Sequence, residues 1–254
     1  MSTARNRVAA AQPIHFARRR FVGGAAAALA GVAIAPGLIL FEAGRSAAAP
    51  EVASSAVRWG LLVDTTLCGA DCTACVDACR EENGLAVPTR PTDAQWIRKL
   101  ELTDPYSGRT HSLPMMCQHC AQPPCVDVCP TGASFKRADG IVLVDRHLCI
   151  GCRYCMMACP YKARSFVHQN LSGQKPDVPR GKGCVEGCTL CVQRVDRGEQ
   201  PACVEACRTS GRGAMTFGDL NDASSEIARR IRERASVQVR ADLRLDPGVR
   251  YQGL

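Results

Sequence analysis

The chain has 254 residues, 17 of them cysteine and only 5% aromatic, which allows one or two domains but gives little aromatic material for an ordinary core. The formal net charge of +8 is typical of proteins that bind nucleic acid or anionic membranes, yet the first 48 residues hold six of the 32 basic residues and one of the 24 acidic ones. The remaining 26 basic and 23 acidic residues nearly cancel, so the composition excludes a strongly basic mature protein and we expect no nucleic-acid partner.

The first residues have the pattern of an export signal. Arginines at 18–20 precede an apolar run rich in Ala and Gly at 22–41, and small residues follow at 46–49; this order is typical of a signal peptide. Two consecutive arginines with Phe21 at the second position after them indicate the twin-arginine route. We predict a signal peptide over 1–48, cleaved after Ala48, and a periplasmic protein. A Sec signal or an uncleaved anchor is the alternative, since about 20 apolar residues can span a bilayer.

The region from 58 to 113 is expected to hold a strand, a cysteine group and a hairpin. Apolar residues predict a strand at 59–63, and strands at 96–102 and 109–113 flank turn residues at 104–108. Between them lie the four cysteines of the first group: Cys68, Cys72, Cys75 and Cys79. A strand that leads into a cysteine loop and a short helix is the order found in ferredoxins.

Two more cysteine groups follow, separated by a predicted hairpin at 134–136 and 141–144. The second group is Cys117, Cys120, Cys125 and Cys129, and the third is Cys149, Cys152, Cys155 and Cys159. The third has the spacing C-x2-C-x2-C-x3-C-P, in which three thiolates bind one [4Fe–4S] cluster and the fourth binds a different one. Twin-arginine export suits such a protein, because its clusters must be assembled before the thiols meet an oxidising compartment.

The fourth group contains Cys188, Cys191, Cys203 and Cys207. Because the fourth cysteine of a group serves the neighbouring cluster, the middle groups predict one cluster held by Cys117, Cys120, Cys125 and Cys159 and one held by Cys129, Cys149, Cys152 and Cys155. By the same rule the outer groups predict one cluster held by Cys68, Cys72, Cys75 and Cys207 and one held by Cys79, Cys188, Cys191 and Cys203. The sequence therefore predicts four [4Fe–4S] clusters.

Cys184 is the one cysteine of the 17 that these four sets leave over. It could replace Cys188 as a ligand, because Cys184-x3-Cys188-x2-Cys191 repeats the opening of the first group. We assign Cys188, since the tighter C-x2-C loop is the commoner clamp. Two alternatives belong to other classes: a structural zinc or metal-storage protein, which would need separated C-x2-C pairs, and a disulfide framework, which suits smaller chains with an even number of cysteines.

Several single residues attract attention beside the cysteines. His119 lies between two predicted ligands and is expected to donate a hydrogen bond within the cluster loop. Arg80 and Arg208 follow the last cysteines of the outer groups, where the middle groups have Pro130 and Pro160, and we predict that they raise the reduction potentials of the outer clusters. No nucleophile motif, phosphate-binding loop or dinucleotide fingerprint is found, so we expect no catalytic site in this chain.

The predicted fold is α+β, with two interlocked ferredoxin-like units of short strands and helices around the four clusters. Residues 58–110 and 171–220 form the outer unit, and 111–170 form a unit inserted into it. A helix predicted over 224–234, capped near Asp222, has Ile227 and Ile231 on one face. It belongs to a C-terminal segment of helix and tail over 221–254.

The stretches at 117–133, 141–163 and 187–207 resemble the four-cluster ferredoxin-like subunits that partner molybdopterin oxidoreductases and polytopic quinone-interacting membrane proteins. The leader, the C-x3-C opening and the stretch at 213–222 are most similar to DsrO-type subunits of dissimilatory sulfur metabolism. That resemblance implies electron transfer between an integral membrane quinone-interacting subunit (DsrP- or NrfD-like) and a multihaem cytochrome c (DsrJ-like), with membrane contact through the partner. The alternative is the iron–sulfur subunit of a tetrathionate, polysulfide or dimethyl sulfoxide type reductase, partnered by a molybdopterin subunit.

Overall fold

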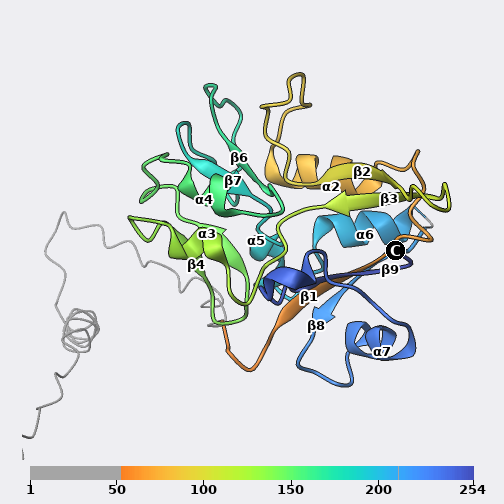
Figure 1. Cartoon of the computed structure of the whole chain (residues 1–254). Coiled ribbons are helices and arrows are strands. Elements are labelled where there is room, and N and C mark those ends of the chain that lie inside the picture. Colours follow the sequence, from red (N-terminus) through yellow and green to blue (C-terminus); the bar gives the residue numbers. More distant parts are fainter. Residues whose placement is uncertain (1–52, 211) are drawn as a thin grey trace, which may run out of the picture. The chain divides into compact units, whose positions relative to one another are not determined.

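The computed structural model describes residues 53–210 and 212–254, and the predicted signal peptide lies outside them. The described part mixes short helices and short strands, as the α+β prediction requires (Figure 1). In chain order the elements are β1 (Trp59–Asp64), α2 (Ala74–Asn83), β2 (Arg98–Thr103), β3 (Thr110–Met115), α3 (Pro124–Asp127), β4 (Ser134–Lys136), β5 (Val142–Val144), α4 (Tyr154–Ala158), β6 (Arg164–Phe166), β7 (Val185–Gly187), α5 (Val192–Val195), α6 (Ala202–Thr209), β8 (Met215–Asp219), α7 (Glu226–Glu233), a 3₁₀ turn at Ala241–Leu243, and β9 (Val249–Gln252).

The largest sheet has three strands in the order β8-β1-β9. Strand β1 lies in the middle, with Leu61 opposite Phe217 of β8 and Val249 of β9. Leu61, Leu62 and Val63 are all at most 1% exposed, because a central strand covered on both faces reads as a continuous apolar run. The strand predicted at 59–63 is confirmed, but the parallel pairing of β9 with β1 was not expected from the sequence.

Both predicted hairpins form. Strands β2 and β3 pair antiparallel with Leu102 opposite His111, and β4 pairs with β5 with Ser134 opposite Val144. A third antiparallel pair joins β6 to β7, with Ser165 opposite Glu186. Strand β7 lies beyond residue 170, the predicted end of the inserted unit, yet pairs with a strand inside it. The polypeptide therefore returns to the inserted unit before it enters α5.

Two pairs of helices face each other. Helix α2 packs against α6, and α3 packs against α4. In Figure 1 the pair of α2 and α6 lies beside the three-stranded sheet, while α3 and α4 lie together at the other side of the molecule. Each pair joins segments that are separated in the chain, and all four helices carry cysteines.

Helix α7 confirms the predicted C-terminal helix, with a different cap. Its N-cap is Ser225, whose Oγ accepts a hydrogen bond from the Ala228 amide at 3.2 Å, while Asp222 accepts one from the Ser224 amide. Ile227 is fully buried against the sheet. Among the described residues, no helix combines the length and the apolar character needed to cross a bilayer.

Candidate cluster-binding sites

Each of the four cysteine-bearing helices presents two cysteines one turn apart. Cys75 and Cys79 lie on α2, and Cys203 and Cys207 lie on α6. In the inserted unit Cys125 is on α3 with Cys129 just beyond its end, and Cys155 is on α4 with Cys159 as its C-cap. Residues four apart share one face of a helix but differ in height along it by about 6 Å. Two facing helices can therefore supply ligands to two neighbouring sites at once.

Three hollows are each lined by four cysteines. The members of these sets are as follows: the first outer set is Cys68, Cys72, Cys75 and Cys207, the first inner set is Cys117, Cys120, Cys125 and Cys159, and the second inner set is Cys129, Cys149, Cys152 and Cys155. Their volumes, including the mouths, are about 310, 320 and 270 Å³ respectively. Three hollows of nearly equal size, with the same donor set and otherwise mainly apolar linings, fit three copies of one prosthetic group.

A second outer set is formed by Cys79, Cys188, Cys191 and Cys203. Burial and then the neighbouring thiols of Cys79 and Cys203 raise the pKa of Cys188 well above its ordinary value. Burial and then the Cys191 and Cys79 thiols likewise raise the pKa of Cys203. These mutual effects show that the four thiols are neighbours, although Cys188 is also influenced by the Cys117 thiol and Cys203 by the Cys75 thiol. The structure therefore gathers three of the four predicted combinations in one hollow each and places the thiols of the fourth near one another.

Cys184 lies apart from this second outer set. Its Sγ donates to the carbonyl oxygen of Arg146 at 3.2 Å, and it lies 4.0 Å from the carbonyl oxygen of Cys149. Burial and then the Cys149 thiol raise its pKa. The structure therefore places Cys188, not Cys184, near Cys79 and Cys203; which of the two binds iron stays a prediction.

The sets have the polar environment that cluster thiolates need. Backbone N–H groups point at the sulfurs, from Ser134 to Cys129 at 3.3 Å and from Ala163 to Cys159 at 3.5 Å. The amides of Val185 and Leu190 point likewise at Cys149 and Cys188. Burial and neighbouring thiols raise the pKa of Cys75 and Cys120 to about 12, so these thiols ionise at neutral pH only where a metal replaces the proton. Hollows lined by four cysteines, with backbone N–H groups aimed at the sulfurs, fit a [4Fe–4S] cluster.

The loops around the sulfurs adopt unusual backbone conformations. Arg153, Leu190 and Cys191 all have φ between 50° and 66°, the left-handed region that non-glycine residues seldom occupy. At Gly151, where φ is 71°, a Cβ would lie 2.3 Å from the carbonyl oxygen of Gly183. The close approach of the third cysteine group to the β6–β7 hairpin thus requires glycine at 151.

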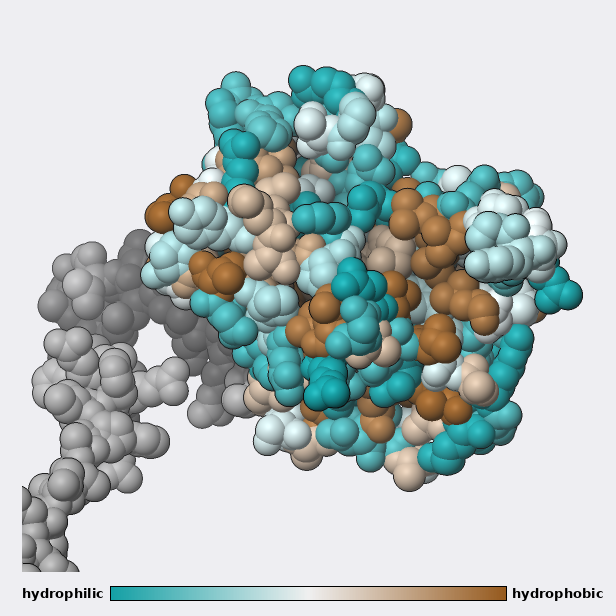
Figure 2. Space-filling model, viewed as in Figure 1, coloured by the Kyte–Doolittle hydropathy of each residue, from teal (hydrophilic) through white to brown (hydrophobic). Residues whose placement is uncertain are grey.

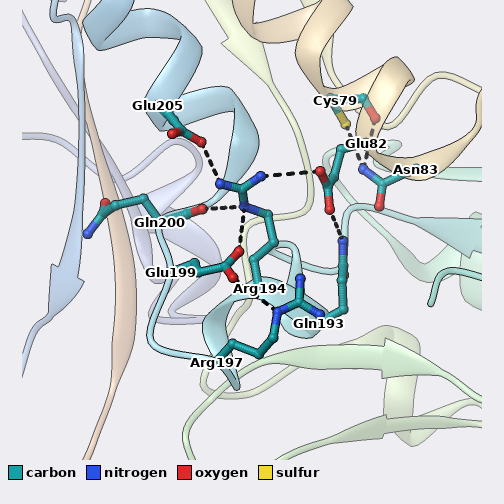
Figure 3. A network of polar contacts seen from close by, with 9 residues as sticks. All are labelled: Cys79, Glu82, Asn83, Gln193, Arg194, Arg197, Glu199, Gln200 and Glu205. Carbon is teal, nitrogen blue, oxygen red and sulfur yellow. Dashed lines mark hydrogen bonds and ion pairs between the residues drawn. The ribbon is translucent and has the colours of Figure 1, made fainter.

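Polar contacts hold the second outer set in place (Figure 3). Arg194 of α5 forms ion pairs with Glu82 of α2 at 3.3 Å and with Glu205 of α6, and donates to the carbonyl oxygen of Gln200 at 2.8 Å. On α2, Asn83 donates to the carbonyl oxygen of Cys79 at 2.8 Å and lies 3.6 Å from its Sγ. The network joins the three helices that carry Cys79, Cys203 and the residue after Cys191.

A lysine closes the loop of the first outer set. Nζ of Lys99, on β2, donates to the carbonyl oxygens of Gly69, Ala70 and Cys72. Its charge also lowers the pKa of Cys68, against the larger opposing effect of burial. Sequence analysis missed this residue because a single lysine in a strand has no recognisable pattern.

The structure also places the two arginines and the histidine that the sequence singled out. Arg80 forms an ion pair with Asp77 at 2.9 Å, Arg208 is exposed, and neither donates to a sulfur among the described contacts; their effect on the reduction potentials of the outer clusters stays a prediction. His119 is buried, and burial lowers its pKa to about 3. Its Nδ1 accepts a hydrogen bond from the Val142 amide at 3.0 Å, so at this nitrogen it is an acceptor and not the expected donor.

The comparisons with known proteins agree with this chemistry. Residues 108–220 match the family described as a 4Fe-4S dicluster domain. The chain is 42% identical to the Hdr-like menaquinol oxidoreductase iron-sulfur subunit 1 of Archaeoglobus fulgidus, over 93% of this chain and 98% of that protein. The chain belongs to the family of [4Fe–4S] iron–sulfur subunits. This iron–sulfur subunit is also 41% identical to protein NrfC of Escherichia coli, over 75% of this chain and 78% of NrfC.

A third relative of the iron–sulfur subunit is a tetrathionate reductase subunit of Salmonella typhimurium, 37% identical over 78% of this chain and 73% of that protein. Membership confirms the predicted [4Fe–4S] chemistry. The first cysteine group lies before the matched domain, so the number four stays a prediction. Within 53–210 and 212–254, no three Cys, His, Asp or Glu side chains are close enough to hold a single metal ion; a cubane makes no such demand, because each of its irons takes one thiolate.

Proposed function

We propose that the iron–sulfur subunit carries electrons through four [4Fe–4S] clusters between an integral membrane quinone-interacting partner and a second redox partner. The observation that supports this most directly is the gathering of sixteen cysteines into four sets of four. A [4Fe–4S] cluster held by four thiolates takes up and returns one electron. With every ligand position filled by protein sulfur, no iron is left open to a substrate, so we assign the chain no catalytic site.

The contacts between sets give an order for the path. The first outer set is joined to the second by one turn of α2, from Cys75 to Cys79, and by one turn of α6, from Cys207 to Cys203. Cys188 of the second outer set and Cys117 of the first inner set line the same hollow, so these two sets are neighbours. One turn at α3 and one turn at α4 then join the first inner set to the second. Electron tunnelling falls steeply with distance, so this row of short steps supports a wire with the first outer and second inner sets at its ends.

The second inner set is open to the surface. Cys152 is the one exposed cysteine among the described residues. Two apolar side chains near it in the chain are exposed as well, Ile150 by 67% and Met157 by 74%. Apolar residues also reach the surface at several other places, as the face drawn in Figure 2 shows. We assign the second inner set as one of the two points where electrons enter or leave.

The identity of the partners is the finer part of the proposal. We propose a periplasmic, DsrO-like subunit that is exported folded by the twin-arginine route and contacts the membrane through a DsrP- or NrfD-like protein. Its second partner is then a multihaem cytochrome c of the DsrJ type. The similarity to the tetrathionate reductase subunit of Salmonella typhimurium favours one other candidate, the electron-transfer subunit of a molybdopterin reductase.

Anaerobic purification of the tagged full chain from membranes tests the proposal. We expect about 16 iron and about 16 acid-labile sulfide per chain, and a paramagnetic resonance signal on reduction. Co-purification of a cytochrome c with a polytopic membrane protein supports the DsrO-like assignment, whereas a molybdopterin subunit supports the other candidate. A colourless protein that contains zinc would overturn both. Replacing the arginines at 18–20 with lysine should leave the protein in the cytoplasmic fraction.

A further inference from the structure

Arg164, the first residue of β6, is a buried cation between the two inner sets. Only 9% of its surface is exposed. Its Nη2 donates to Sγ of Cys125, in the first inner set, at 3.2 Å. The same nitrogen donates to Oγ of Ser134 at 2.7 Å, and Ser134 lines the hollow of the second inner set. The guanidinium therefore reaches from one inner set to the wall of the other.

No carboxylate of the described residues supplies the counter-charge for the Arg164 guanidinium. Among the described residues no Asp or Glu lies within 4.0 Å of Arg164, and its Nη1 is buried without a hydrogen-bond partner. Arginine is almost never buried unless it is paired, because an isolated buried charge is strongly unfavourable. The groups whose negative charge would act most strongly on this guanidinium are the thiols of Cys125, Cys155 and Cys117, which belong to both inner sets.

We propose that Arg164 is a counter-cation shared by the two inner clusters, and that it raises the reduction potentials of both. The proposal rests on the four-cluster assignment above. Each cluster with its thiolates bears about two negative charges when oxidised, and one-electron reduction adds a third without taking up a proton. A fixed positive charge beside the sulfurs stabilises the reduced form more than the oxidised form. Nη1 of Arg164, which has no hydrogen-bond partner, can donate to a sulfur of either cluster.

Arg164 differs in burial and pairing from the two arginines that the sequence pointed to. The sequence pointed to Arg80 and Arg208, beside the outer sets, but Arg80 pairs with Asp77 and Arg208 is exposed to solvent, where water and salt screen its charge. Arg164 is shielded from both. We therefore expect the two inner clusters to be easier to reduce than they would be in the same hollows without the guanidinium.

A redox titration of the holoprotein, monitored by electron paramagnetic resonance, tests the proposal. Arg164→Gln removes the charge and keeps a hydrogen-bond donor. We expect full iron content and, for two of the four clusters, at least a tenfold smaller equilibrium constant for reduction, which is about 59 mV for one electron. Arg164→Lys, which keeps the charge, should retain most of the wild-type potential.

The matched control is Lys162→Gln. Lys162 is a cation two residues before Arg164, but it is exposed, so its loss should change the same equilibrium constants less than twofold. Equal shifts in Arg164→Gln and Lys162→Gln, or unchanged potentials in Arg164→Gln with full iron, would overturn the proposal. A wild-type protein without iron would instead overturn the cluster assignment itself.

A second measurement covers the case in which Arg164→Gln fails to assemble. Wild-type protein grown with ¹⁵N-labelled arginine is reduced and examined for hyperfine coupling of ¹⁵N to the cluster signals. We expect coupling on the signals of two clusters, and its loss in Arg164→Lys made with the same label. The absence of any ¹⁵N coupling in the wild-type protein would refute the proposal without need of a variant.

Discussion

Replacing Cys188 with Ala should remove one cluster, whereas replacing Cys184 with Ala should remove none. Cys188 lies among the other three thiols of the second outer set, and the Leu190 amide points at its Sγ at 3.4 Å. Cys184 donates instead to the carbonyl oxygen of Arg146 and has the Cys149 thiol as its neighbour. With four irons in each cluster, Cys188→Ala should lower the iron content from about 16 to about 12 per chain, and Cys184→Ala should leave it at about 16.

The assay is anaerobic purification of both variants with iron and acid-labile sulfide determination on the same samples. Spectra of the reduced proteins should lose one cluster signal in Cys188→Ala and keep all signals in Cys184→Ala. Because Cys184 adjoins Cys149 of the second inner set, its replacement should change at most the signal of that set. A full complement of iron in Cys188→Ala together with loss of a cluster in Cys184→Ala would refute the ligand assignment.

Three other substitutions, with one control, test how the sites are held. Arg194→Met breaks the partly exposed network among α2, α5 and α6, and should cost about 1.4 kcal/mol, so that a chelator bleaches the protein about tenfold faster. Arg137→Met leaves Asp139, whose side chain is 2% exposed, without its cation. It should lower the free energy of unfolding by about 3 kcal/mol and the temperature of cluster loss by about 10 °C. The control Arg197→Met, at an exposed ion pair, should change that temperature by under about 2 °C. Lys99→Met frees the three carbonyl groups of the first cluster loop and should speed the loss of about four irons; an unchanged rate would show that the lysine does not hold the loop.

Short-range signals predicted much of this fold. The hairpin of β4 and β5 and that of β2 and β3 depend on alternation and turn residues that lie within about twenty residues of each other. The cysteine sets were predicted from spacing and one rule, that the fourth ligand crosses to the neighbouring cluster, and the structure brings the same cysteines together. Iron ligation by these cysteines stays a prediction until the metal is counted.

Features that depend on distant segments were beyond the sequence. Nothing in 249–252 shows that β9 pairs with β1, nearly 190 residues earlier, and nothing in 185–187 shows that β7 returns to β6. Lys99 and Arg164 are single basic residues whose roles arise only where the folded chain places them beside cluster loops. Arg80 and Arg208 were chosen because they follow cysteines directly, but residues next to each other on a helix point in different directions, so sequence neighbours of a ligand need not face its sulfur.

Clusters bound as proposed would make the two predicted units depend on each other. The first outer set takes three thiols from 68–75 and one from Cys207, so a cluster bound there closes a loop of more than 130 residues. Closing such a loop costs conformational entropy that grows slowly with its length, and iron–thiolate bonds formed at folding offset this cost. The inserted unit lies wholly within that loop. Its own two sets must therefore form without obstructing the approach of α6 to α2. The Arg137–Asp196 ion pair at 2.7 Å joins the β4–β5 hairpin to the C-cap of α5. It fixes the inserted unit against the segment that supplies Cys203 and Cys207.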